Sequence, residues 1–296
     1  MDDRFRFRIS RSGGAAHGLI AAGGTGRVAA VFTHSFYLES ADAMACIGDG
    51  SLGLGPLNAI CDAPRGIDWP ASGLRVGAAY RSAGDGIQVG DRFAFSTAEA
   101  ETWVPRPCPA GWRPETLQPG LDNLDRHIIG RIPMEGLAPL VFGGADSAVG
   151  RAARTPVAGL GAWLAAEAPG DPTPWVRALI GLGPGLTPSG DDFLGGAMIV
   201  LHLLARRPAL AGLAAAVQAC ATATNPISRA HLAAAADGQG SAAIHDLLDD
   251  LLRGELSSLD NRLIAVDHIG HCSGWDALAG IVTTLRAVCL AAAEAA

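Results

Sequence analysis

The stretch Trp103-Val-Pro-Arg-Pro-Cys-Pro-Ala-Gly-Trp-Arg-Pro-Glu-Thr-Leu-Gln-Pro119 decides how the chain is divided, because it contains five prolines. Proline removes a backbone N–H and fixes φ, so this stretch propagates neither a helix nor a central strand. Apolar residues recur with period two before it and with period 3.6 after it. The sequence therefore predicts an α+β fold: a mostly antiparallel β domain over residues 1–110, barrel-like or sandwich-like, followed by an all-α domain over residues 111–296.

The two periodicities also give approximate element positions. The strand-like stretches are Arg4 to Ile9, Val28 to Leu38, Leu74 to Tyr80 and Ile87 to Ser96. We interpret the N-terminal residues Met1 to Arg8, which overlap the first of these stretches, as an edge strand. The helix-like stretches are Leu121 to Ile132, Pro156 to Ala168, Phe193 to Arg206, Leu210 to Ala221, Ile227 to Ala236, Ile244 to Leu252, Leu256 to Val266 and Trp275 to Ala293.

Composition excludes several functional classes. The 296 residues carry a net charge of −7, and all 22 basic residues are arginine. Without lysine there is no Walker-type phosphate lysine and no Schiff base, and without a basic field a nucleic-acid partner is not expected. The six cysteines show no metal-ligand spacing, and the apolar runs are too short or too charged to span a bilayer. We expect a cytoplasmic protein with free thiols and no membrane partner.

The most informative stretch is Gly181-Leu-Gly-Pro-Gly-Leu-Thr-Pro-Ser-Gly-Asp-Asp192, a glycine-rich loop that leads into an apolar helix. Such a junction presents backbone N–H groups and the positive end of the helix dipole, and it binds anions such as phosphate. Asp191 and Asp192 would repel an anion there, and a Mg²⁺ ion held by these carboxylates would resolve the conflict. The alternative is that Ser189-x-x-Asp192 is only a helix cap.

A second stretch repeats the pattern of the first. Ser189 to Gly196 and Ser273 to Gly280 both read S-G-x-D-x-L-x-G, and each opens an apolar helix. A glycine inside a helix lowers its stability, which indicates close packing against another backbone. We therefore expect the two helices to pack together with Asp192 and Asp276 facing one pocket. Convergent capping chemistry in an Ala/Gly-rich chain is the alternative.

Polar residues between and beside these helix starts are further candidates. His271 precedes a helix, where the dipole favours the neutral ring of a general base. We treat His268 as structural and assign Cys272 no role as a nucleophile. Asn225 should cap another helix, with Arg229 in its first turn, where a bound carboxylate or a salt bridge would compensate its charge. The site residues predicted in this way are catalytic His271, Asp192 and Asp276; ligand-binding Gly183, Gly185, Thr187, Ser189, Gly190, Asn225, Ser228, Arg229, Ser273 and Gly274; and metal-binding Asp191 and Asp192.

Gly181 to Asp192, Ile227-Ser228 and Gly270 to Gly280 resemble a bacterial family that includes the third subunit of oxamate carbamoyltransferase. The resemblance spans most of the chain, including the turn Gly53-Leu-Gly-Pro56, and Cys272 departs from the family, since a small polar residue is expected there. The resemblance implies phosphorolysis of oxalurate to oxamate and carbamoyl phosphate, or its reverse, together with two partner subunits. On this interpretation the glycine loop would hold phosphate or carbamoyl phosphate, Arg229 the substrate carboxylate, and His271 a proton of the reacting nitrogen.

Two other functional classes stay open from the sequence. One is a stand-alone Mg²⁺-dependent helical hydrolase or lyase that uses Asp191, Asp192 and Asp276. The other is a non-catalytic subunit whose β half docks a partner enzyme while its glycine loop senses an anion. The sequence does not decide between monomer and homo-oligomer.

Overall fold

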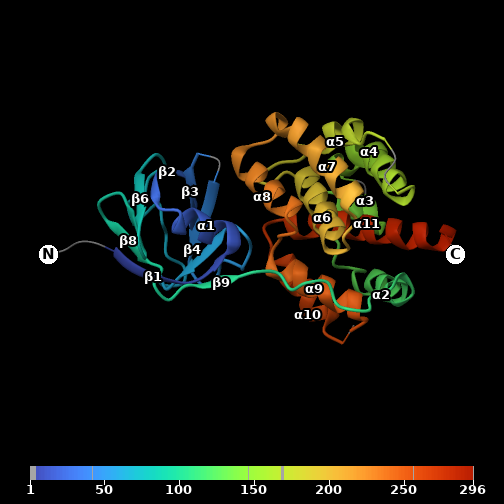
Figure 1. The fold of residues 1–296 in the computed structure, drawn as a ribbon, viewed down its shortest axis with the longest axis horizontal. Coiled ribbons are helices and arrows are strands. Elements are labelled where there is room, and N and C mark those ends of the chain that lie inside the picture. The colour runs from blue at the N-terminus through green and yellow to red at the C-terminus, as the bar shows by residue number, and fades with distance from the viewer. Residues whose placement is uncertain (1–4, 42, 146, 168–169, 256, 296) are drawn as a thin grey trace. The chain divides into compact units, whose positions relative to one another are not determined.

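The computed structural model describes residues 5–41, 43–145, 147–167, 170–255 and 257–295, and it divides the chain into two compact units (Figure 1). One unit spans Met1–Pro105 and the other Arg106–Ala296. The division lies inside the proline-rich stretch.

In its described residues, the first unit is built from nine strands and one helix. They are β1 (Phe5–Gly13), α1 (Gly14–Ala21), β2 (Gly24–Val31), β3 (Ser35–Ser40), β4 (Ala43–Gly48), β5 (Asn58–Cys61), β6 (Ala79–Ala83), β7 (Gly86–Val89), β8 (Phe93–Ser96) and β9 (Glu101–Trp103). The predicted stretch from Val28 to Leu38 is two strands, because the chain reverses between Phe32 and Ser35, where the Phe32 N–H donates to the Ser35 carbonyl at 2.8 Å.

The strands form one sheet that closes on itself. Their order is β5-β4-β3-β2-β6-β7-β8-β1-β9, and an additional pairing of β5 with β1 completes the ring. Most neighbours are antiparallel, whereas β1 is parallel to β8 and β9, and β4 is parallel to β5. The expectation that the first strand lies at an edge was wrong, because β1 pairs on both of its sides.

The interior of the barrel is aromatic. Trp69 is fully buried and lies edge-on to Phe36 at 4.9 Å between ring centroids. Phe93 and Phe95 point inward from alternate positions of β8, as the two-residue period of a strand requires. This core is separate from the core of the helical unit.

The second unit consists of helices in its described residues. They are α2 (Pro114–His127), α3 (Ala138–Phe142), α4 (Ala148–Ala165), α5 (Thr173–Leu179), α6 (Ser189–Leu203), α7 (Arg207–Ala219), the 3₁₀ helix η1 (Ala221–Ala223), α8 (Pro226–Ala236), α9 (Ala242–Arg253), α10 (Leu259–Asp267) and α11 (Ser273–Ala295). Each stretch predicted as helical overlaps one of these helices. The exclusion of helix as far as Pro119 was wrong, because α2 begins at Pro114, a first-turn position that needs no N–H donor.

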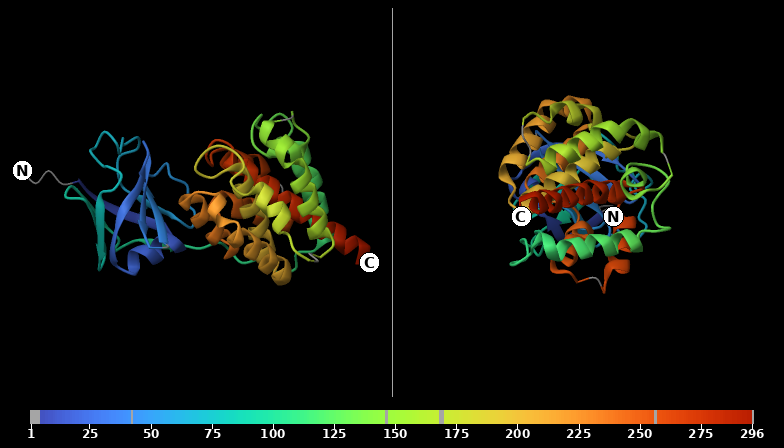
Figure 2. Two further views of the ribbon diagram at one scale, coloured as in Figure 1. Left: turned by 90° about the horizontal axis from the view of Figure 1, so that it is seen from above. Right: turned by 90° about the vertical axis from the view of Figure 1, so that its right-hand side faces the viewer.

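The long helix α11 lies along α6 in the core of this unit (Figure 2). Its residues Trp275, Leu278 and Val282 are buried. The segment Ser273–Glu294 is long and apolar enough to cross a membrane by composition alone, contrary to the sequence expectation, but 56% of its most apolar window is buried inside the protein. That burial is typical of a core helix.

Candidate functional site at two helix starts

The glycine loop adopts backbone conformations that favour glycine. Gly181, Gly183 and Gly185 have φ values of +74°, +113° and +97°, all in the left-handed region. A Cβ on Gly181 would lie 2.3 Å from the Ala223 carbonyl oxygen, whereas a Cβ on Gly185 would meet nothing within 4 Å. Gly181 is therefore required for packing as well as conformation, and Gly185 lies in the open part of the loop.

The loop turns directly into α6, and Ser189 does not cap this helix. Pro188 occupies the N-cap position without a side-chain hydrogen bond, and Ser189 is the first helical residue. The Gly190 N–H donates to the Leu182 carbonyl at 2.9 Å, and the Asp191 and Asp192 N–H groups donate to Pro188. The expectation of unpaired N–H groups was thus wrong for these three, since main-chain acceptors already use them.

Asp191 ties the loop to the start of α8. Its carboxylate accepts hydrogen bonds from the Gly181 N–H at 2.6 Å, from the Ser228 hydroxyl at 2.5 Å and from the Thr224 hydroxyl. The residue is only 2% exposed. Sequence reasoning missed Thr224, although it stands next to the predicted cap Asn225.

Asn225 strengthens the same connection. Its Oδ1 caps α8 by accepting from the Ser228 N–H at 3.1 Å, as predicted, and its Nδ2 donates to the Leu186 carbonyl at 2.8 Å. Arg229 is exposed, and its guanidinium donates to the Thr224 carbonyl at 3.2 Å. The start of α8 therefore holds the loop in place, and the Arg229 side chain lies on the protein surface beside it.

The two helices that share the S-G-x-D-x-L-x-G pattern pack through their glycines, which confirms that prediction. A Cβ on Gly196 would lie 2.1 Å from the Ala277 carbonyl oxygen, and one on Gly280 would lie 1.9 Å from the Phe193 carbonyl oxygen. The contact is reciprocal, because the glycine at the eighth position of each repeat meets the carbonyl at the fifth position of the other. Only glycine permits backbones to approach this closely.

The starts of α6 and α11 consequently meet. The Thr187 and Ser273 hydroxyls are hydrogen-bonded at 2.9 Å, and the Ser189 hydroxyl lies 3.9 Å from the Cys272 sulfur. Asp192 and Asp276 interact with these groups and with each other. We call these six side chains the helix-start cluster: Thr187, Ser189, Asp192, Cys272, Ser273 and Asp276.

Asp192 is an unusual carboxyl group. Burial raises its pKa well above the ordinary value, and the charge of Asp276 acts in the same direction, while hydrogen bonds from Ser273 and Thr187 oppose the shift. Its Oδ2 atom is buried without a hydrogen-bond partner. This environment favours the protonated, neutral form of Asp192 over the charged form.

Asp276 is fully buried and held by a segment that the sequence did not single out. Its Oδ1 accepts from the Leu137 N–H at 2.6 Å, and its Oδ2 has no hydrogen-bond partner. A Cβ on Gly136, which has φ +76°, would lie 2.3 Å from Oδ1. Burial raises the pKa of Asp276, and the hydrogen bond from Leu137 opposes that shift.

The remaining predicted residues lie beside the cluster. His271 is exposed and its Nε2 lies 3.3 Å from a carboxylate oxygen of Glu135. Burial, followed by the charge of Asp276, raises the pKa of the Cys272 thiol to about 12, so it is a thiol at neutral pH and a weak nucleophile. Gly274 allows α11 to pass Val266, whose carbonyl oxygen would lie 2.1 Å from a Cβ.

The raised pKa of Asp192 makes stability depend on pH. The folded state keeps a proton that the unfolded chain releases above about pH 4, so the stabilisation is complete at low pH and is lost as pH rises through the folded-state pKa. Asp192→Asn removes this term. In urea denaturation, the free energy of unfolding of the variant minus that of wild type should increase with pH, by up to ~1.4 kcal/mol per pH unit. Parallel pH profiles would contradict a protonated Asp192.

Asp191 and Asp192 are not part of a larger group of potential metal ligands in the described residues. Within the described part of the chain there is no group of three or more His, Cys, Asp or Glu side chains arranged to hold a metal ion. The predicted Mg²⁺ at Asp191 and Asp192 would have to take most of its ligands from a substrate and water.

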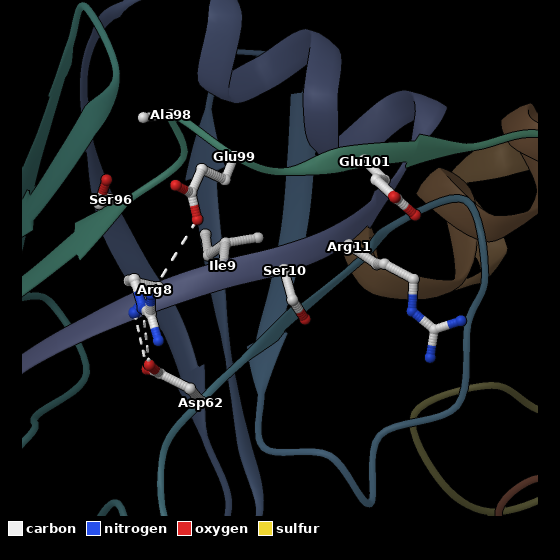
Figure 3. A pocket seen from close by; sticks show the side chains of 9 residues that line it. All are labelled: Arg8, Ile9, Ser10, Arg11, Asp62, Ser96, Ala98, Glu99 and Glu101. Atoms are coloured by element: carbon white, nitrogen blue, oxygen red, sulfur yellow. Dashed lines mark hydrogen bonds and ion pairs between the residues drawn. The ribbon is translucent and has the colours of Figure 1, made fainter.

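A cavity of about 530 Å³ lies in the barrel unit (Figure 3), at the place along β1 where its parallel partner changes from β8 to β9. Its wall is charged, but Arg8 is paired with Asp62 at 3.2 Å and with Glu99 at 4.0 Å. These side chains are largely exposed, and the sequence predicted no role for them.

Comparison with known proteins connects the helix starts with one family. No curated protein and no solved structure matches the chain. A family model described as oxamate carbamoyltransferase subunit AllH matches residues 179–285, which lie entirely within the helical unit and include the glycine loop, α6 and the start of α11. The expectation that the resemblance spans most of the chain was wrong, because the match does not include the turn from Gly53 to Pro56. The chain is therefore similar, over the segment that builds the helix-start cluster, to the AllH subunit of oxamate carbamoyltransferase.

Proposed function

We propose that the chain is a subunit of a cytoplasmic carbamoyltransferase that acts on oxalurate, oxamate and carbamoyl phosphate, and that its substrates bind at the helix-start cluster. One observation carries the proposal. The matched segment begins two residues before Gly181 and contains the whole cluster, so the family likeness and the unusual carboxyl groups fall on the same residues.

The environment of Asp192 supports phosphate binding at the neighbouring loop. The sequence suggested a conflict between an anion and two carboxylates at one helix end, which a Mg²⁺ ion would resolve. Since burial favours the neutral form of Asp192, and Asp191 is engaged by three donors, much of that repulsion is removed without a metal. The N–H groups of Gly185 and Leu186, which lie in the exposed part of the loop, can then donate hydrogen bonds to phosphate oxygens.

Other groups would act from the rim. Arg229 and His271 are exposed and hence available to a substrate carboxylate and to a reacting nitrogen, respectively. Exposure at the rim is also compatible with two further protein subunits completing the site. Asp192, whose pKa is raised by burial, is the candidate to donate a proton to the transferred carbamoyl group.

The test is reconstitution with the products of the neighbouring genes, followed by measurement of carbamoyl phosphate formation from oxalurate and phosphate. We expect turnover to require this chain and to fall about 10²-fold or more in Asp192→Asn, because the amide cannot donate a proton. Asp260→Asn, a change of a largely exposed carboxylate on α10, is the matched control. Full activity in Asp192→Asn would remove that residue from the mechanism, and activity of the chain alone that chelation abolishes would instead support a Mg²⁺-dependent enzyme.

A further inference from the structure

One wall of the cavity in the barrel unit is formed by a bulge in β1. In the ladder with β5, Ser10 is an extra residue between Ile9 and Arg11. Ser10 and Arg11 are therefore both exposed, whereas Ile9 is buried. Strict alternation would place Arg11 on the buried face with Ile9. The bulge thus adds a second arginine to the exposed face that already carries Arg8, and bulges often re-aim side chains beside functional sites in this way.

Another wall comes from the connection between β8 and β9. Both strands are parallel to β1, but β8 ends at Ser96 and β9 begins at Glu101, so the residues between them leave the ladder. Hydrogen bonds hold this connection: the Thr97 N–H donates to the Asp85 carbonyl at 2.8 Å, and the Ala100 N–H donates to the Thr97 carbonyl at 3.0 Å. The cavity of about 530 Å³ is therefore part of the fold, and its volume is typical of small-molecule sites.

The charges around this cavity are only partly compensated. At one end, Arg8 pairs with both Asp62 and Glu99. At the other end, Arg11 and Glu101 are direct cross-strand neighbours, yet within the part of the chain that the structure describes neither side chain has an ion pair or a hydrogen bond (Figure 3). Opposite charges in such a register normally interact. The cavity therefore offers a guanidinium donor and a carboxylate acceptor that are adjacent and both available.

These two groups together select a dipolar ligand. A carboxylate accepts two parallel hydrogen bonds from a guanidinium, and an ammonium or amide N–H donates to a carboxylate. We propose that the cavity binds a small carboxylate whose neighbouring carbon carries N–H donors, with its carboxylate on Arg11 and its nitrogen on Glu101. A simple anion would satisfy Arg11 alone. The site lies outside the matched residues 179–285 and does not depend on the proposed function.

The experiment is calorimetric titration of the whole chain with oxamate, glycine and acetate. Oxamate carries an amide and glycine an ammonium group next to the carboxylate, whereas acetate has no nitrogen. We expect oxamate, glycine or both to bind at least about tenfold more tightly than acetate, and the tighter ligand identifies the nitrogen group that the cavity prefers. Equal affinity for all three compounds, or binding of none of them, would overturn the proposal.

Two variants locate the bound ligand. Arg11→Gln should weaken binding of the preferred ligand about tenfold or more, and Glu101→Gln should reduce its advantage over acetate, while the main-chain pairing of β1 with β9 remains. Arg81→Gln, a change of an exposed arginine on β6 outside the cavity, is the matched control and should bind like wild type. An equal loss in this control would reveal a general effect of charge and overturn the proposal. Loss of binding in Asp192→Asn, with none in Arg11→Gln, would place the ligand at the helix-start cluster and also overturn it.

Discussion

Gly280→Ala should lower the free energy of unfolding by about 3 kcal/mol, measured by urea denaturation of the whole chain. The new methyl group would lie 1.9 Å from the Phe193 carbonyl oxygen, and this neighbour is backbone within a buried helix. Relief requires that α6 and α11 move apart, which opens the contact on which the helical core is centred. Gly196→Ala should act similarly, and because both changes separate the same helix pair, the double variant should cost less than the sum.

Gly195→Ala is the matched control for this prediction. It lies next to Gly196 on the same helix, but its Cβ would meet only the Ala235 Cβ, at the ordinary distance of 3.6 Å. Alanine also favours the helix by about 1 kcal/mol relative to glycine. We expect this variant to be as stable as wild type or more so. Equal stability of Gly195→Ala and Gly280→Ala would show that the close approach of the helices is not what glycine provides.

The pair α6 and α11 shows which parts of the candidate site could be predicted from the sequence and which could not. The repeated serine, aspartate and glycine positions were sufficient to predict that two distant helices pack together and bring Asp192 and Asp276 to one place. Spacing carried that information because helical periodicity fixes which residues share a face. The main-chain donor to Asp276 could not be predicted in this way, since it is the N–H of Leu137, and every residue except proline has one.

From the sequence both adjacent aspartates were assigned to a metal ion and Asp192 also to catalysis, and the structure gives the two residues different environments. Successive helical residues point about 100° apart, so Asp191 faces the loop and α8 while Asp192 faces α11. Tertiary packing decides which of the two aspartates meets hydroxyl donors and which meets a second carboxyl group. The local sequence pattern does not contain this information.

The barrel strands were harder to predict for a different reason. Alternation identifies a strand that is buried on one face only. The strand β4, Ala43–Gly48, is buried at nearly every position and β5 is similar, so neither shows a period of two. The short helix α1 was missed because its Ala/Gly-rich sequence carries little amphipathic signal.

Asp191→Ala should destabilise the chain by about 3 kcal/mol or more and should loosen the glycine loop before the rest of the helical unit. The substitution leaves three donors without their acceptor, the Gly181 N–H and the hydroxyls of Thr224 and Ser228, at a position that is only 2% exposed. Hydrogen bonds to a charged acceptor contribute about 1.5–3 kcal/mol each, and the donors left behind add the cost of burial. Asp260→Ala, which removes an exposed carboxylate paired with Arg131, should cost less than about 1 kcal/mol.

Hydrogen exchange locates this effect within the fold. If Asp191 holds the loop to α8, its loss should speed amide exchange at residues 181–187 and at the start of α8, while exchange in the barrel unit stays at the wild-type rate. The anion binding that we propose for the loop should weaken in parallel, because binding to a loosened loop must supply the ordering free energy that Asp191 supplies in the wild type. Unchanged exchange at the loop, with a loss of stability spread evenly over the helical unit, would mean that the loop is held mainly by Asn225 and by its own glycine conformations.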